Sequence, residues 1–252
     1  MRPRRSPALV GVHEGSRVTF RDPSRWVERE RFILDRCEGK TVLHLGCLGE
    51  TESPTADRVS FFLSERSLHS QLVRSADRVI GIDVDLETIN AIQIRANQTI
   101  HFGDVEKLTE STIPTEFRPD LILAGDLIEH LSNPGAMLDG ASLWLSPTAE
   151  LLLTTPNALG LPNYLRFLFR RYREGGDHVQ TYSIFTLSNL LARHGYQVSE
   201  SFTCWQRRSA NEMHRTIRAR LLFRVASQLL SRLPRLGGTL LIVARKSADD
   251  RT

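Results

Sequence analysis

The chain has few of the residues that stabilise small secreted proteins or span membranes. Its 252 residues include only three cysteines, Cys37, Cys47 and Cys204, and none of them forms a C-x-x-C pair. Such isolated thiols indicate neither a disulfide framework nor a zinc site. No window approaches the roughly 20 apolar residues of a membrane-spanning helix, and the basic N-terminus precedes only a short apolar run. A cytoplasmic protein is therefore expected, and no metal site is predicted.

Lysine is also scarce, and arginine supplies nearly all the positive charge. The net charge of +4 is unevenly distributed: residues 41–160 carry about −10 and residues 161–252 about +10. Hydrophobic residues make up 40% of the chain, which is enough for one large core. The composition thus predicts one globular unit with a strongly basic C-terminal third.

Short apolar runs alternate with helical stretches along the middle of the chain, as in a parallel sheet covered by helices. Strands are predicted at residues 41–45, 78–83, 99–102, 120–124, 150–154, 197–203 and 239–245. Helices are predicted at residues 24–37, 86–95, 134–145 and 184–194. The fold class is therefore α/β, a doubly wound and mostly parallel sheet of seven strands.

The remaining segments decorate this one domain, which is expected to span residues 21–246. Residues 1–20 are expected to form a polar, mobile N-terminal arm, and residues 247–252 a short tail. Residues 50–69 are predicted as an insertion after the first strand. Residues 161–182 and 211–236 carry the arginine-rich runs and are predicted to form a helical cap.

Glycines and acids follow the first four predicted strands, where open α/β sheets bind their ligands. These segments are Gly46-Cys47-Leu48-Gly49, Asp83-Val84-Asp85, Gly103-Asp104-Val105 and Gly125-Asp126-Leu127. Glycine lets the backbone approach a ligand closely. A carboxylate that ends a strand accepts hydrogen bonds from the hydroxyls of a ribose or from an adenine amino group.

These segments resemble the motifs of the class I S-adenosylmethionine-dependent methyltransferases, in their small-molecule branch. VLHLGCLGE is similar to the first motif of that family, VIGIDVD to the second, HFGDVEKL to the third and DLILAGDLIEHLSNP to the fourth. The resemblance runs from about residue 41 to residue 196. It implies a Rossmann-like methyltransferase fold with S-adenosylmethionine as cofactor.

The resemblance assigns roles in cofactor binding to the matching positions. Gly46 and Cys47 would contact the amino-acid portion, Asp83 the ribose diol, Asp104 the adenine and Asp126 the methionine moiety. The full set of predicted cofactor-binding residues is His44, Gly46, Cys47, Asp83, Val84, Asp104, Val105, Asp126 and Leu127. His44 stands where the family usually has an acid, and Leu48 and Glu50 stand where it has glycines, which leaves an inactive relative open.

Methyl transfer to a hydroxyl benefits from a base, and two histidines are candidates. His130 follows the fourth motif, and His178 lies near the basic segment; either could instead have only a packing role. Arg170, Arg171 and Tyr182 are predicted to bind the acceptor, since paired guanidinium groups suit a phosphate or carboxylate. The expected acceptor is a small or glycan-like molecule, anionic in character, methylated on oxygen.

Three other functions compete with this hypothesis. The basic residues beside aromatic ones are also typical of nucleic-acid methyltransferases, but residues 125–128 lack the Asn/Asp-Pro-Pro-aromatic pattern of enzymes that act on base amino groups. A nicotinamide-dependent oxidoreductase would need G-x-G-x-x-G after the first strand, which is absent. A catalytically inactive partner or regulatory protein would keep the same fold.

Residues 219–236 also leave contact with an anionic membrane surface open. The sequence does not predict the oligomeric state.

Overall fold

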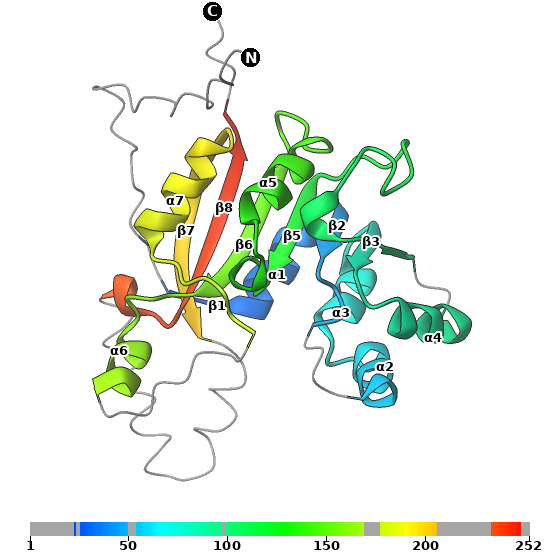
Figure 1. Ribbon diagram of the computed structural model, residues 1–252, viewed down its shortest axis with the longest axis horizontal. Helices are drawn as coiled ribbons and strands as arrows, with labels where there is room; N and C mark the ends of the chain where they lie inside the picture. The colour runs from blue at the N-terminus through cyan, green and yellow to red at the C-terminus, as the bar shows by residue number, and fades with distance from the viewer. Residues whose placement is uncertain are drawn as a thin grey trace, which may run out of the picture.

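A single mixed sheet of eight strands forms the centre of the molecule (Figure 1). The structure, a computed structural model, describes residues 23, 26–49, 54–96, 99–168, 177–205 and 233–247. The strand order is β1-β7-β8-β6-β5-β2-β3-β4, and β8 runs antiparallel to its two neighbours while the other pairs are parallel. The strands are β1 Trp26–Glu28, β2 Thr41–Leu45, β3 Arg78–Asp83, β4 Ile100–Phe102, β5 Leu121–Gly125, β6 Glu150–Pro156, β7 Tyr196–Trp205 and β8 Thr239–Lys246.

Helices cover both faces of this sheet (Figure 1). α1 (Arg29–Cys37) and α3 (Leu68–Ser75) pack on one face, and α5 (Pro134–Ser142) and α7 (Ile184–Arg193) pack on the other. α2 (Thr55–Leu63) packs against α4 (Leu86–Ala96) beside β4, and α6 (Leu161–Leu168) follows β6. Three short 3-10 helices are η1 (Val105–Lys107), η2 (Ile128–His130) and η3 (Pro234–Leu236). Within the described ranges, no helix is long and apolar enough to cross a bilayer.

The central strands are apolar on both faces because both faces are covered. In β2, Leu43 and Leu45 pack into the cluster beneath α5 and α7, whereas Val42 packs beneath α1 and α3. Alternate residues of a strand point to opposite faces, so a strand buried on both sides must be apolar at nearly every position. This burial explains why the predicted strands were readable from short apolar runs.

The sheet confirms the predicted fold class and adds one strand to the expected seven. The helix predicted at residues 24–37 begins only at Arg29, because Trp26, Val27 and Glu28 pair in parallel with β7. Backbone pairing with an otherwise unpaired sheet edge takes these three residues out of the helix. The other predicted strands and helices recur with boundaries shifted by at most three residues.

Several predicted decorations lie wholly or partly outside the described residues. The arm at residues 1–20, nearly all of the tail, residues 169–176 of the first cap segment, which include Arg170 and Arg171, and most of the second cap segment are among them. The predicted insertion at residues 50–69 contains α2 and the start of α3. The connection from β2 to β3 therefore contains two helices.

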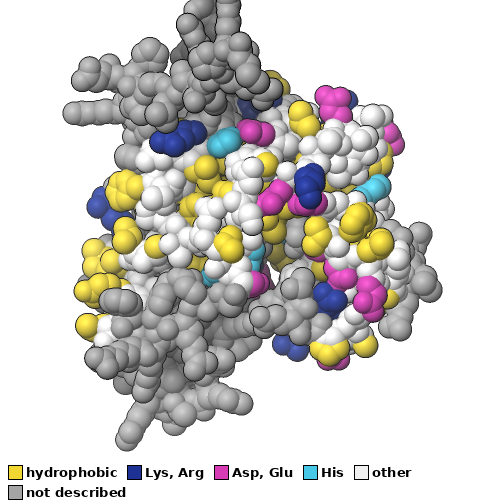
Figure 2. All heavy atoms as spheres, in the orientation of Figure 1, with side chains coloured by type: hydrophobic (Ala, Val, Ile, Leu, Met, Phe, Trp, Pro, Cys, Tyr) yellow, Lys and Arg dark blue, Asp and Glu magenta, His cyan; other side chains and the backbone are white. Residues whose placement is uncertain are grey.

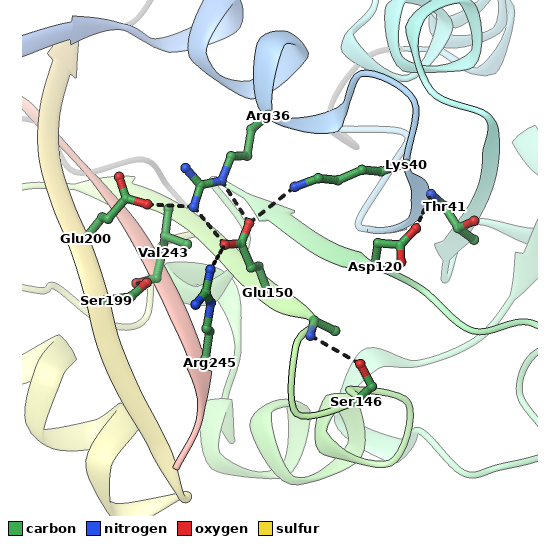
Figure 3. Close-up of polar contacts among 11 residues, drawn as sticks. Arg36, Lys40, Thr41, Asp120, Ser146, Glu150, Ser199, Glu200, Val243 and Arg245 are labelled. Atoms are coloured by element: carbon green, nitrogen blue, oxygen red, sulfur yellow. Dashed lines mark hydrogen bonds and ion pairs between the residues drawn. The ribbon is translucent and has the colours of Figure 1, made fainter. Parts of the chain in front are cut away.

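A cluster of charged side chains joins α1, β6, β7 and β8 at the amino end of β6 (Figure 3). The Glu150 carboxylate accepts hydrogen bonds from Arg36 at 2.8 and 2.7 Å and from Arg245 at 2.8 Å, and Lys40 lies 3.4 Å away. Arg36 also bonds to Glu200 at 2.6 Å. The cluster lies at the opposite end of the parallel strands from the glycine-rich loops, so it is structural.

Candidate active site

Strand register places the loops after β2, β3 and β5 side by side. Leu45 pairs with Ile82 on one side and with Ala124 on the other, so these strands end at the same level. β2 is also the point where the strand order changes direction, with β5 on one side and β3 on the other. Open α/β sheets bind ligands at such a switch point, beyond the carboxyl ends of the strands. Figure 2 shows a hollow near the middle of the viewed face, bordered by histidine and acidic side chains.

The loop after β2 turns sharply at two glycines. Gly46 and Gly49 have φ values of 65° and 74°, which side chains with a Cβ rarely adopt. A Cβ on Gly46 would lie 2.8 Å from Cδ1 of Leu127, so the loops after β2 and β5 are in close contact. A Cβ on Gly49 would meet nothing within 4 Å among the residues that the structure describes. The loop therefore offers backbone without side chains where a ligand could approach.

Asp83 ties this loop to the end of β3. Its Oδ2 accepts a hydrogen bond from Leu48 N at 2.9 Å, and its Oδ1 accepts from Val84 N at 2.8 Å and Asp85 N at 3.3 Å. Burial raises the pKa of Asp83, whose exposed fraction is 7%, and these backbone donors oppose the shift. A carboxylate has about four lone-pair sites, so capacity remains for a ligand hydroxyl.

Apolar side chains lie exposed around the two acids predicted to bind the nucleoside. Val84 and Phe102 are more than half exposed, and Phe102 pairs with Asp83 in the sheet. Asp104 caps η1 and bonds to Lys107 at 2.8 Å, which lowers the pKa of Asp104, while Val105 is buried in the core. The glycine turns, the buried acid and this apolar rim fit an adenosyl group.

Two of the side chains predicted to bind the cofactor are buried in the protein interior, beneath the loop that follows β2. His44 is buried in β2, and its Nδ1 lies 3.2 Å from Nδ1 of His69 on α3. Cys47 is buried near Gly81, and burial raises the pKa of its thiol well above the usual range. Their assignment to the cofactor stays a prediction, and for Cys47 only the backbone lies along the loop.

Asp126 is held by two residues that the motifs did not indicate. Its Oδ2 lies 3.1 Å from Arg29 Nη2, and Thr154 Oγ1 donates to its Oδ1 at 2.9 Å. Its φ of 50° makes it the one residue other than glycine with a positive φ within the described part of the chain. Arg29 begins α1, far away in the sequence, so no local pattern could have placed it beside the fourth motif.

Polar side chains converge just beyond Asp126. Burial, reinforced by the charge of Asp126, raises the pKa of Glu129 to about 8. His130 Nδ1 lies 3.0 Å from Asp177 Oδ2, and the rings of His130 and His178 meet edge to face at 4.7 Å between centroids. The structure thus brings together the two histidines predicted as bases, together with two acids that were not singled out.

Tyr182 lies beside this group, in a buried position. Its hydroxyl donates to Gln180 Oε1 at 2.7 Å, and burial raises the pKa of Tyr182 to about 12, with the charge of Glu129 adding to the shift. Carboxylate and imidazole atoms of Glu129, His130 and His178 lie within 4.8 Å of one another, close enough to hold a metal ion after small movements. Both histidines were predicted from the sequence but Glu129 was not, and no local pattern indicated that residues 129–130 and residue 178 meet.

Comparison with known proteins identifies the class to which this fold and site belong. The sequence profile of a methyltransferase-domain family matches residues 15–201, about three quarters of the chain. The chain therefore belongs to this family of methyltransferases, with S-adenosylmethionine as its cofactor.

Individual relatives are more distant. The chain is 27% identical over 143 residues to a ubiquinone biosynthesis O-methyltransferase of Rhodopseudomonas palustris, a match that covers 56% of this chain and 50% of the relative. The chain thus spans about half the length of that relative.

Solved structures share the fold. An S-adenosylmethionine-dependent methyltransferase from Mesorhizobium loti superimposes with a TM-score of 0.51 at 18% identity, covering 86% of this chain and 95% of that one. The magnesium protoporphyrin IX methyltransferase of Synechocystis, solved with bound SAH, superimposes with a TM-score of 0.52 at 14% identity, covering 86% and 82%. At these identities the likeness concerns the fold alone.

Proposed function

We propose that the chain transfers the methyl group of S-adenosylmethionine to an oxygen atom of a small-molecule or glycan-like acceptor. The observation that supports this most is the convergence of the glycine loop, Asp83 and the Glu129–His130 pair at the switch point of the sheet. The similarity to an O-methyltransferase over about half the chain supports oxygen as the acceptor atom.

The cofactor supplies an activated methyl group on a positively charged sulfonium. We assign the residues of this chain the task of holding the two reactants in line, which can account for much of the rate acceleration. Asp83 and the loop of Gly46 to Gly49 bind the nucleoside and amino-acid ends. Asp104 binds the adenine, and Asp126 lies beside the methionine moiety.

The acceptor side is assigned to Glu129, His130 and His178. They would bind the acceptor hydroxyl, and His130 or His178 would accept its proton as the oxygen–carbon bond forms and the sulfur–carbon bond breaks, which releases the demethylated cofactor. Tyr182 lies next to them and would contact the acceptor. An anionic acceptor follows from the basic C-terminal third, with Arg170 and Arg171 as its predicted contacts, and this assignment rests on the sequence alone.

Calorimetric titration with S-adenosylmethionine, and separately with its demethylated product, tests the cofactor site. The unmodified protein is expected to bind in the micromolar range, and Asp83→Ala is expected to weaken binding at least tenfold, because a ribose contact and the anchor of the Leu48 backbone are both lost. Asp35→Ala, which removes a carboxylate from the exposed face of α1, is the matched control and should bind normally.

Two results would contradict the proposal. Normal affinity of Asp83→Ala would refute the assignment of that carboxylate. A folded protein that binds neither ligand at millimolar concentration would favour the inactive partner or regulatory protein. The acceptor atom is decided by mass analysis of products from matched phenols and anilines: methylated phenols are expected, and methylation of anilines alone would exclude O-methylation.

A further inference from the structure

Three metal-ligating side chains meet at the acceptor side of the site although they come from distant segments. Glu129 and His130 lie on η2, and His178 lies in the segment before α7. Backbone hydrogen bonds from Val179 N and Gln180 N to the carbonyl oxygen of Glu129, at 3.0 and 3.1 Å, fix that segment against η2. The meeting of the three side chains is therefore held by the backbone.

One of the two oxygens of the buried Glu129 carboxyl group has no donor among the described residues. Its residue is 1% exposed, and its Oε2 has no hydrogen-bond partner among the residues that the structure describes. A buried polar atom without a partner costs free energy, commonly about 1 to 3 kcal/mol and more if charged. A carboxylate oxygen of Glu129 lies within 4.8 Å of a ring nitrogen of His130 and of His178, so a cation held between the three side chains would compensate the buried carboxyl group.

His130 is oriented as a metal-binding histidine usually is. Its Nδ1 pairs with Asp177 Oδ2 at 3.0 Å, which leaves Nε2 as the ligand atom. Histidines that bind metals almost always pair their other ring nitrogen with a carboxylate, a carbonyl or water, which fixes the ring. Asp177 is thus a positioning residue, independent of the three donors.

We propose that Glu129, His130 and His178 bind one divalent first-row transition ion. One carboxylate and two imidazoles suit such ions better than Ca²⁺ or Mg²⁺, which prefer oxygen alone. Around a tetrahedral ion, ligand atoms about 2.0 to 2.2 Å from the ion lie about 3.3 to 3.6 Å from one another. Side-chain movements of about 1 Å would therefore bring the three ligand atoms, which lie within 4.8 Å of one another, into place. With only three ligands from the protein, coordination positions of the ion remain open for oxygen atoms of water or of a bound molecule.

The ion would bind the acceptor oxygen, and this part of the inference rests on the proposed function. A hydroxyl bound to a divalent ion loses its proton to water at a lower pH than a free hydroxyl does. Acceptors with two neighbouring oxygen atoms would then be preferred, because both could bind the ion. His130 would act through the ion, which replaces its predicted role as a general base.

Cobalt titration tests the site without any assay of activity. Untagged protein, stripped with a chelator, is titrated with Co²⁺ while its visible absorption is recorded, and bound Co²⁺ is then displaced with Zn²⁺. One Co²⁺ per chain is expected. Affinity should fall at least tenfold in His130→Gln and in His178→Gln, and about tenfold in Asp177→Asn, since partners of metal-bound histidines typically contribute 10- to 100-fold.

His194→Gln is the matched control, because His194 also pairs with a carboxylate, Asp139, at 2.6 Å but lies at the C-terminal end of α7, away from these donors. It should bind Co²⁺ like the unmodified protein. Equal affinity of His130→Gln and the unmodified protein, or the absence of saturable binding, would overturn the inference. Titration of the same samples with S-adenosylmethionine separates the two proposals, because cofactor binding without Co²⁺ binding refutes only the ion, and the reverse refutes the cofactor site.

Discussion

Single side chains decide how the loop after β5 is held beside the candidate site. Arg29 reaches Asp126 and also donates to Thr154 Oγ1, at 2.9 Å from Nη2 and 3.2 Å from Nε. The Arg29 side chain is 13% exposed, so its ion pair is poorly screened by water. Asp126 is thereby fixed in its unusual backbone conformation.

Replacement of Arg29 with Gln is expected to lower the free energy of unfolding by about 2 kcal/mol, since buried hydrogen bonds to charged groups contribute about 1.5 to 3 kcal/mol. Affinity for S-adenosylmethionine should fall as well, because Asp126 loses its partner. Denaturant unfolding and calorimetry measure the two effects. Arg31→Gln, on the exposed face of the same helix, should change neither; an equal effect of both variants would show that only the helix matters.

Strand β2 packs against helix α3 through a pair of buried histidines, one from each element. The rings of His44 and His69 stack at 5.4 Å between centroids, and the ring of Phe62 stacks on His69 at 5.0 Å. Gly81 leaves the space for this stack, since a Cβ there would lie 3.0 Å from the His69 ring. Burial lowers the pKa of His69 to about 4 and the pKa of His44 well below its usual value.

These shifts make β2–α3 packing sensitive to acid. The unfolded chain takes up protons at these histidines below about pH 6.5 while the native protein does not, so stability falls as the pH drops from 6.5 to about 4. His69 alone should account for about 3 kcal/mol of this loss. Unfolding free energies measured across this range should show a shallower slope in His69→Gln, and an unchanged slope would contradict the assignment.

At the scale of the whole molecule, Glu150 connects helix α1 with strands β6 and β8. The guanidinium of Arg36 and its neighbours lower the pKa of Glu150 to about 2 against the opposing effect of burial. A carboxylate with a lowered pKa stabilises the native state above its unfolded pKa of about 4.5, and this contribution is lost as the pH falls to about 2.

Glu150→Gln is expected to remove about 3 kcal/mol at pH 7, which corresponds to the size of the shift. The difference in unfolding free energy between the two proteins should shrink from pH 4.5 to pH 2. A difference that stays constant with pH would mean that Glu150 acts by packing and not by charge. Glu150 lies at the opposite end of the strands from the site, so binding of S-adenosylmethionine at pH 7 should be retained.

The sequence by itself determined the order of the strands and helices along the chain and the acids at the strand ends. Local patterns suffice for these, because apolar runs, glycines and proline report on a few neighbouring residues. The eighth strand was not predictable, since Trp26 to Glu28 become a strand only by pairing with β7.

Only the tertiary structure decided which side chains meet. Arg29 joins Asp126 across the sheet, His44 faces His69 instead of the loop, and His178 reaches Glu129 and His130 through backbone bonds between distant segments. Such contacts depend on strand register and crossover direction, which bring together residues that no local pattern relates. The proposed cofactor side of the site was therefore visible in short motifs, whereas the meeting of His130, His178 and Glu129 on its proposed acceptor side depended on folding.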